Sequence, residues 1–222
     1  RALRLFQYLL VHRFRWVPRD EIIEALWPET DPAKGLNSLR QTVYVLRNTL
    51  AGSDDSGENT DRFISYQNEA LRLDPGEGYV FDVETCEGLL QHAESCWSNG
   101  DGDAAAEAVL AAERSYDDHF LAESPYEEFT VEARQLLRER LLRDVARLCA
   151  WYARRRKWEQ LVPMARRAVS LDPYHEEFHQ RLVEGLSGLG HRAEAVKAFH
   201  HFETLMIREL DLLPSNEIKA LA

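Results

Sequence analysis

The chain has 222 residues, which is enough for one large domain or two modest ones. Hydrophobic residues make up 45% of it and charged residues 29%, a composition that is typical of globular proteins and excludes a wholly disordered chain. Because 27 Lys and Arg stand against 38 Asp and Glu, the net charge is −11, so the surface as a whole does not attract phosphate groups.

Several kinds of site are disfavoured by the sequence. No apolar run approaches the roughly 18 residues that cross a bilayer, so we expect a cytoplasmic protein with no membrane partner. Cys86, Cys96 and Cys149 lack CxxC spacing, which argues against a disulfide framework or a thiolate zinc site. Neither a dinucleotide-binding nor a P-loop motif occurs, and we expect no cofactor. Arg1 lies inside a helical pattern, so we expect the chain to be truncated at its N-terminus.

The beginning of the chain differs in charge from the rest. Residues 1–19 contain five Arg and no acidic residue, and residues 32–50 contain Lys34, Arg40 and Arg47, again without an acid. Attraction of a charged partner depends on the local field as well as on the total charge. A basic N-terminal module on an acidic chain is therefore compatible with nucleic-acid binding.

Three helices are predicted in the first fifty residues. The apolar spacing favours helices at about 1–12, 19–27 and 33–50. In the third, the buried stripe is predicted to consist of Leu39, Val43, Leu46 and Leu50. The opposite side and its flanks then carry Lys34, Asn37, Ser38, Arg40, Gln41, Tyr44, Arg47 and Asn48. Such side chains suit base edges and phosphates, but the same pattern also fits an ordinary polar surface.

An acidic loop at 51–61 precedes a predicted β-hairpin. Residues 63–66 and 70–73 have the composition of two short strands joined at residues 67–69, and residues 79–81 are predicted to form a third strand. Three helices followed by a hairpin is the order of a winged helix. We therefore place a domain boundary near Asp82.

The remainder of the chain is predicted to be helical. The expected helices are 83–98, 102–117, 126–154, 157–170, 174–188 and 191–210. An internal repeat is also present, because Leu161, Ala165 and Ala168 are matched 34 residues later by Ala195, Phe199 and Phe202. This is the period of tetratricopeptide repeats.

The order and spacing of several segments resemble a known family. Residues 19–28, 37–41 and 46–47 resemble the helix-turn-helix core of the OmpR-like winged helix in SARP-type bacterial activators. Residues 171–176, 190–195 and 208–214 resemble the bacterial transcriptional activation domain of the same proteins. The resemblance spans nearly the whole chain.

The resemblance implies a mainly α-helical transcriptional activator. Residues 1–82 would be a winged-helix DNA-binding domain without the family's leading sheet, and residues 83–222 a tetratricopeptide-like activation domain. The third helix would enter the major groove of double-stranded DNA and the hairpin, with Asn68 and Arg72, would act as the wing. The implied partners are promoter DNA with direct repeats, RNA polymerase and a second copy of the chain on DNA.

Two other readings remain open. The chain is also compatible with a protein-interaction or effector-binding repeat module whose winged helix does not bind DNA. Residues 175–179 spell HExxH, the spacing of a zinc hydrolase, but these residues open a predicted helix where acids are explained by the helix dipole. Because the helix dipole accounts for these acids, we predict that the chain is not an enzyme. The basic run 154–157 is interpreted as a solvated helix end.

Overall fold

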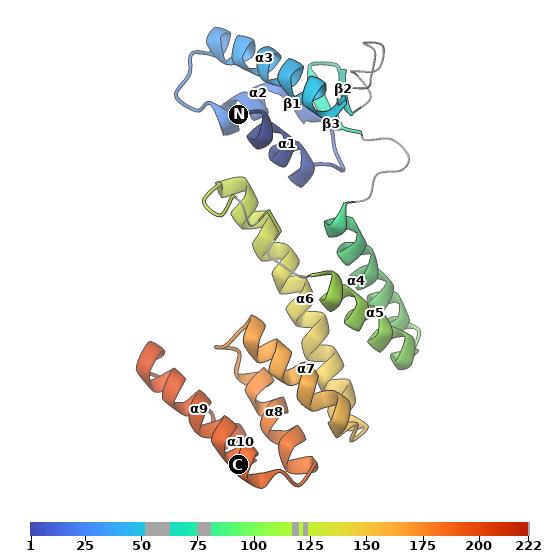
Figure 1. Ribbon diagram of the computed structural model, residues 1–222, viewed down its shortest axis with the longest axis vertical. Helices are drawn as coiled ribbons and strands as arrows, with labels where there is room; N and C mark the ends of the chain where they lie inside the picture. Colours follow the sequence, from blue (N-terminus) through green and yellow to red (C-terminus); the bar gives the residue numbers. More distant parts are fainter. Residues whose placement is uncertain (52–62, 75–80, 117–119, 122–123, 222) are drawn as a thin grey trace. The chain divides into compact units, whose positions relative to one another are not determined.

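The computed structural model describes residues 1–51, 63–74, 81–116, 120–121 and 124–221 (Figure 1). It divides into two compact units. The first comprises Arg1–Phe81 and Asp118–Gln135, and the second comprises Asp82–Asp117 and Leu136–Ala222. The chain therefore returns to the first unit after it has entered the second.

The first unit contains three helices and a three-stranded antiparallel sheet. Its elements are α1 (Ala2–Val11), β1 (Val17–Pro18), α2 (Arg19–Leu26), α3 (Pro32–Ala51), β2 (Ile64–Gln67) and β3 (Ala70–Leu73). The strand order is β1-β3-β2, so that β3 lies between the other two. The core contains Leu5 and Leu9 of α1, Ile22 of α2, Leu39 and Leu46 of α3, and Ile64 and Leu71 of the sheet.

Strand β1 was not predicted from the sequence. It lies between the predicted helices 1–12 and 19–27, where Val17 and Pro18 pair with Leu71 and Ala70. Val17 is fully buried, which explains why a two-residue strand is retained between two helices. Of the strand predicted at residues 79–81, only Phe81 lies within the described residues, and it is not in a strand.

The hairpin between β2 and β3 turns at Asn68 and Glu69. Both residues have positive φ angles, 48° and 61°, as a two-residue type I′ turn requires. Arg19, the first residue of α2, holds this turn: its backbone N–H donates to the Glu69 carbonyl at 2.9 Å, and its guanidinium lies 2.8 Å from the Glu69 carboxylate. The turn is thus fixed against the start of α2.

The later segment of the first unit packs on α1. The Arg4 guanidinium makes two 2.8 Å contacts with the Glu127 carboxylate. The ring of Tyr8 meets the ring of Phe129 edge-on, with centroids 5.1 Å apart. Phe120, Leu121 and Phe129 are partly buried against the core of the first unit. Residues outside the predicted winged helix therefore complete this core.

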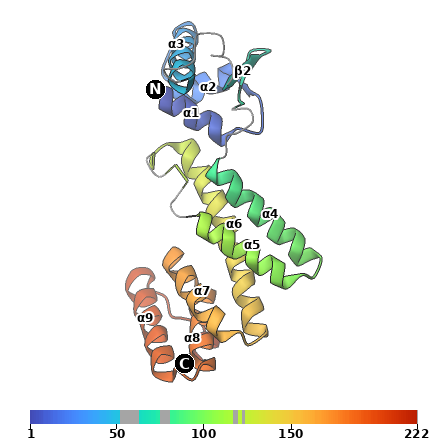
Figure 2. The ribbon, with the colours of Figure 1, turned by 45° about the vertical axis from the view of Figure 1, so that its right-hand side comes forward.

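In the described part of the second unit, all regular secondary structure is helical. Its helices are α4 (Asp82–Ser98), α5 (Gly102–Ser115), α6 (Glu128–Arg154, from Leu136 onward), α7 (Trp158–Leu171), α8 (Glu176–Gly188), α9 (Arg192–Leu210) and α10 (Asn216–Lys219). Helices α4 and α5 pack side by side, as do α7 with α8 and α8 with α9 (Figure 2). Each expected helix of this region is confirmed to within two residues, and α10 was not predicted.

Close contacts fix the helix pairs of this unit. Gly102, at the start of α5, lies under the Trp151 indole, and a Cβ built there would be 2.3 Å from the indole nitrogen. The Trp97 and Trp151 rings meet edge-on. Trp97 and Trp151 are thus packing residues. Cys86, Cys96 and Cys149 are free and buried.

Candidate nucleic-acid interface

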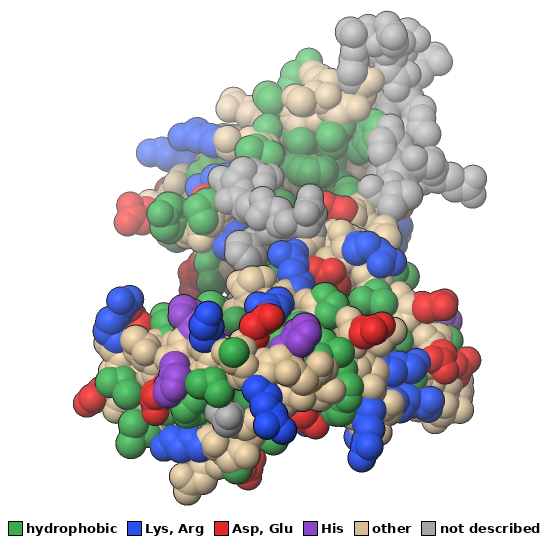
Figure 3. Space-filling model, turned by 60° about the horizontal axis from the view of Figure 1, so that its bottom comes forward, with side chains coloured by type: hydrophobic (Ala, Val, Ile, Leu, Met, Phe, Trp, Pro, Cys, Tyr) green, Lys and Arg blue, Asp and Glu red, His purple; other side chains and the backbone are tan. Residues whose placement is uncertain are grey.

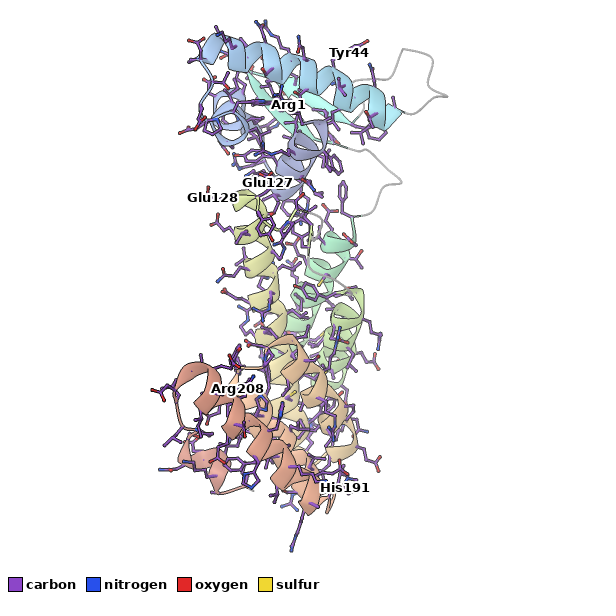
Figure 4. The ribbon with its side chains drawn as sticks, turned by 60° about the vertical axis from the view of Figure 1, so that its left-hand side comes forward. Arg1, Tyr44, Glu127, Glu128, His191 and Arg208 are labelled. Carbon is purple, nitrogen blue, oxygen red and sulfur yellow. The ribbon has the colours of Figure 1, made fainter. Side chains whose placement is uncertain are left out.

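The outward face of α3 carries most of the predicted contact residues. Lys34, Asn37, Arg40, Gln41 and Tyr44 are all exposed, and Tyr44 retains 68% of its accessible surface. Figure 4 shows Tyr44 directed away from the body of the first unit. Helix α3 contains no acidic residue. This face therefore presents amides, a phenol and two cations to a partner without a repelling carboxylate on the same helix.

The position of α3 is set by its opposite face. Leu39 and Leu46 are buried as predicted, whereas Val43 and Leu50 are only partly buried against the core. Gly35 lies against α2, where a Cβ built on it would be 2.6 Å from Cγ2 of Ile23. The Asp31 carboxylate accepts a hydrogen bond from the Ala33 N–H at the beginning of the helix.

Thr42 completes the buried stripe and was missed in the sequence. Its hydroxyl donates to the carbonyl of half-buried Ser38 at 2.7 Å, which satisfies the polar group inside the core. When a threonine hydroxyl is hydrogen-bonded to the preceding turn of its own helix, the side chain can pack in the core like an apolar one. Hydrophobic spacing alone does not reveal this.

Arg47 connects α3 to the sheet. It is half-buried, and one of its terminal nitrogens donates to the Ile64 carbonyl at 2.6 Å, where β2 begins. The rotation of the helix predicted a flanking contact residue. In the structure, Arg47 makes a hydrogen bond within the fold.

A groove of about 370 Å³ lies between α3 and the hairpin. Arg40, Tyr44 and Arg47 line it together with Arg19 and Tyr66, over a floor that includes Leu39 and Leu71. Arg19 and Tyr66 were not among the predicted site residues. Their positions depend on the pairing of β1 with β3 and on the register of the hairpin, neither of which local sequence specifies.

The two predicted wing residues differ in their surroundings. Asn68 is exposed at the tip of the hairpin. Arg72 is half-buried: its guanidinium contacts the Asp74 carboxylate at 2.6 Å and lies 4.9 Å from the ring centroid of Trp16. Asn68 is therefore presented to a partner, whereas Arg72 stabilises the base of the hairpin.

Acids from other segments neutralise much of the basic N-terminus. Arg4 pairs with Glu127, Arg15 with Glu21, and Arg19 with Glu69. The hydrogen bond from Arg15 lowers the pKa of Glu21. Burial, together with the hydrogen bond that Tyr8 donates to Glu21, raises the pKa of Tyr8 to about 12. Three of the five Arg side chains of residues 1–19 are thus paired with acids, whereas Lys34 and Arg40 of α3 have no acidic partner among the described residues.

A family model described as "Bacterial transcriptional activator domain" matches residues 81–222, which is more than half of the chain. The chain belongs to this family. The sequence resemblance to SARP-type regulators is confirmed at this level. The members of this activator-domain family are transcriptional regulators and not enzymes.

Two regulators resemble the whole chain. The transcriptional regulatory protein MoaR1 of Mycobacterium tuberculosis is 22% identical over 233 residues, covering 96% of this chain and 68% of MoaR1. MoaR1 of Mycobacterium bovis matches with the same identity and coverage. The solved structure of Mycobacterium tuberculosis EmbR in complex with a low-affinity phosphopeptide superposes with a TM-score of 0.72 at 21% identity, and shows the same fold. The chain covers 55% of the EmbR chain.

In this activator-domain protein, the HExxH residues serve packing. His175 precedes α8 instead of lying within it, and its ring stacks on Phe178. The Nε2 atom of buried His179 lies 2.9 Å from the Pro173 carbonyl, and the ring stacks on Phe202. Burial lowers the pKa of His179. In the described part of the chain, no three His, Cys, Asp or Glu side chains are grouped as metal ligands would be.

The basic run at the end of α6 is partly engaged. The Arg155 and Lys157 cations lie 4.6 Å and 4.3 Å from the ring centroid of Trp151, and Lys157 also contacts Asp103. Burial raises the pKa of the Cys149 thiol to about 12, which disfavours the thiolate form. Among the described residues, no helix is long and apolar enough to cross a membrane.

Proposed function

We propose that the first unit binds double-stranded DNA as a winged helix, with α3 in the major groove. The observation that carries this proposal is the exposed, acid-free face of α3, which is held on a buried stripe and bordered by the hairpin. Membership of a family of transcriptional regulators supports it. The element order of three helices and a hairpin is that of a winged helix.

The chemistry of the face suggests a role for each side chain. Asn37 and Gln41 carry amides that match the paired donor and acceptor of adenine, and Arg40 suits guanine. Lys34 and Tyr44 are suited to phosphate oxygens at the borders of the groove. Ser38 and Arg47 are half-buried, so we assign them supporting contacts. Asn68 at the hairpin tip would contact the adjacent backbone.

The second unit would connect DNA binding to transcription. We propose that its repeated helices contact RNA polymerase or respond to a regulator. The residues that repeat after 34 positions, Leu161, Ala165 and Ala168 and then Ala195, Phe199 and Phe202, are all buried, as a tetratricopeptide-like stack requires. Binding to direct repeats as a dimer stays a prediction.

DNA binding can be tested by selection, which does not require a known operator sequence. The 222-residue chain is used to select duplexes from a random library, and its affinity for the selected duplex is compared with that for a scrambled one. Gln41→Ala should cost about 1–3 kcal/mol on the selected duplex and much less on the scrambled one. Gln91→Ala, which changes an exposed glutamine in α4, serves as the matched control.

The dependence on salt distinguishes the two classes of function. A protein that neutralises phosphates loses affinity as the salt concentration rises. If the chain selects no duplex even at low salt, the winged helix does not act on DNA and the interaction-module reading is favoured. If Gln41→Ala weakens both duplexes equally, Gln41 contacts the backbone and the assigned base contact is wrong.

A further inference from the structure

The second unit has a groove that the proposed DNA interface does not use. It has a volume of about 450 Å³ and is formed by α7, α8 and α9. Its lining residues are Arg166, Val169, His179, Leu182, Glu194, Lys197, Ala198 and His201. We propose that this groove binds an extended acidic peptide segment of a partner protein, with carboxylates at its basic side chains and an apolar side chain on its floor.

The basic side of the groove comes from two helices. Lys197 and His201 are one turn apart on α9 and both are exposed, and Arg166 faces them from α7. Figure 4 labels His191, which directly precedes α9, and Arg208 in its last turn; Lys197 and His201 lie between these two residues in the sequence. A chain with a net charge of −11 thus places Arg166, Lys197 and His201 around one cavity, and because Arg166 is paired with Glu194, Lys197 is the cation left for a ligand.

The acidic side chain that lines the groove already has basic partners. The Glu194 carboxylate accepts a hydrogen bond from Arg166 at 3.0 Å and lies 3.6 Å from Nδ1 of His191. Lys197 has no ion pair or hydrogen bond to a side chain in the described part of the protein. A ligand carboxylate would therefore find a solvated ammonium group that does not first have to be released.

The floor of the groove favours a peptide over a nucleic acid. Val169, Leu182 and Ala198 supply apolar surface between the charged side chains. Figure 3 shows basic, acidic, histidine and hydrophobic side chains interspersed on the face of the second unit that it presents. Nucleic acid needs phosphate contacts or stacking planes, whereas an extended peptide alternates side chains that suit both parts of such a groove.

His179 lines the groove as a packing side chain whose position is fixed. Its Nε2 is occupied by the Pro173 carbonyl and its ring is stacked on Phe202, so the imidazole cannot turn toward a ligand. Burial lowers the pKa of this imidazole, which disfavours its charged form. The histidine of the HExxH sequence thus forms a fixed wall of this cavity.

The proposal is tested with the full chain and a fluorescein-labelled octapeptide in which Glu alternates with Leu. Fluorescence anisotropy should show saturable binding of this probe and none of the matched peptide in which Lys replaces Glu. The double variant Lys197→Glu with His201→Glu should weaken binding at least about tenfold, because it removes a cation and places two carboxylates where the carboxylates of the peptide would bind. Lys219→Glu, at an exposed position in α10, should have no effect.

A second variant tests the cavity without changing its charge. Ala198→Phe should fill the groove and abolish probe binding, while circular dichroism and the urea midpoint confirm that the variant folds. Equal binding by the double variant and the parent chain would overturn the proposal. The proposal would also be overturned if duplex DNA bound in the groove at Lys197 and His201 and displaced the probe. The groove would then be a nucleic-acid site. Binding of the selected duplex through α3 should be unchanged in all these variants, which separates this proposal from the proposed function.

Discussion

Gln7 and Ser124, which are 117 residues apart in the sequence, exchange two hydrogen bonds. The Gln7 amide nitrogen donates to the Ser124 hydroxyl at 2.8 Å, and the hydroxyl donates to the amide oxygen at 3.0 Å. Gln7 retains 1% of its accessible surface, so no solvent replaces these bonds. The pair joins α1 to the chain segment that returns from the second unit.

We expect Gln7→Ala to lower the free energy of unfolding by about 1–3 kcal/mol, because it removes packing and leaves the Ser124 hydroxyl without its partner. Urea denaturation measures this change. Ser124→Ala should cost less, and the double variant should show a coupling energy of about 0.5–1.5 kcal/mol. Strictly additive losses would show that the two side chains do not act as a pair.

Much of the helical framework could be predicted because its signals are local. Apolar spacing and Pro or Gly breaks located α3 and α9 to within one residue. The two-residue strand β1 carries no periodic signal, so its pairing with β3 could not be predicted. The contact of Gln7 with Ser124 depends on how distant segments meet, which local sequence does not encode.

The candidate site was predictable to the same extent. The exposed face of α3 follows from helix rotation, and the structure exposes Asn37 and Gln41 accordingly. The bond from Arg47 to the Ile64 carbonyl and the entry of Thr42 into the core depend on tertiary packing. Arg19 joins the groove because the hairpin turn reaches α2. A sequence can predict the face of a helix but not which of its side chains the rest of the fold engages.

Gly35→Ala should destabilise the first unit by about 1–3 kcal/mol, because the new methyl group would meet Cγ2 of Ile23. The β-branched Ile23 side chain has few rotamers with which to move away. Gly88→Ala in α4 is the control, since no atom lies within 4 Å of its added Cβ and alanine favours the helix. The control should raise the urea midpoint. If Gly35→Ala also raised it, α2 and α3 would not be in close contact.

Arg40→Ala and Arg47→Ala should differ in their effects. Arg40 is exposed, so its removal should weaken binding to the selected duplex by about 1–3 kcal/mol with little change in stability. Removal of Arg47 should also destabilise the fold by about 1–3 kcal/mol, because the Ile64 carbonyl loses a donor. Paired measurements of duplex affinity and urea midpoint test this. Equal midpoints for both variants would show that the Arg47 bond does not contribute to stability.

Asp144→Asn should stabilise the second unit increasingly as the pH rises. Asp144 is buried and its Oδ1 has no hydrogen-bond partner, and burial raises the pKa of its carboxyl above the ordinary 3.8. At pH values below that ordinary pKa, the carboxyl is protonated in both the folded and the unfolded chain. Its burial then costs no free energy of ionisation. As the pH rises toward the folded-state pKa, the unfolded chain releases its proton first, so stability falls. Urea unfolding between pH 4 and pH 8 measures the difference, and Glu107→Gln, at an exposed position, should show none. A pH-independent effect of Asp144→Asn would contradict the assignment.

A fragment of residues 1–82 should be poorly folded, because part of the first unit's core comes from residues 118–135. In the fragment, buried Gln7 loses Ser124, Arg4 loses Glu127, and the core loses the apolar cover of Phe129. Loss of several such contacts exceeds the stability margin of a domain of this size. Circular dichroism and NMR chemical-shift dispersion should therefore show partial structure only. A synthetic peptide of residues 118–138, added in trans, should restore dispersion, whereas the same peptide with Ser124, Glu127 and Phe129 replaced by Ala should not. If the fragment alone unfolds at the urea midpoint of the first unit in the full chain, residues 118–135 do not stabilise the first unit. The coupling inferred from Gln7 and Ser124 would then be wrong.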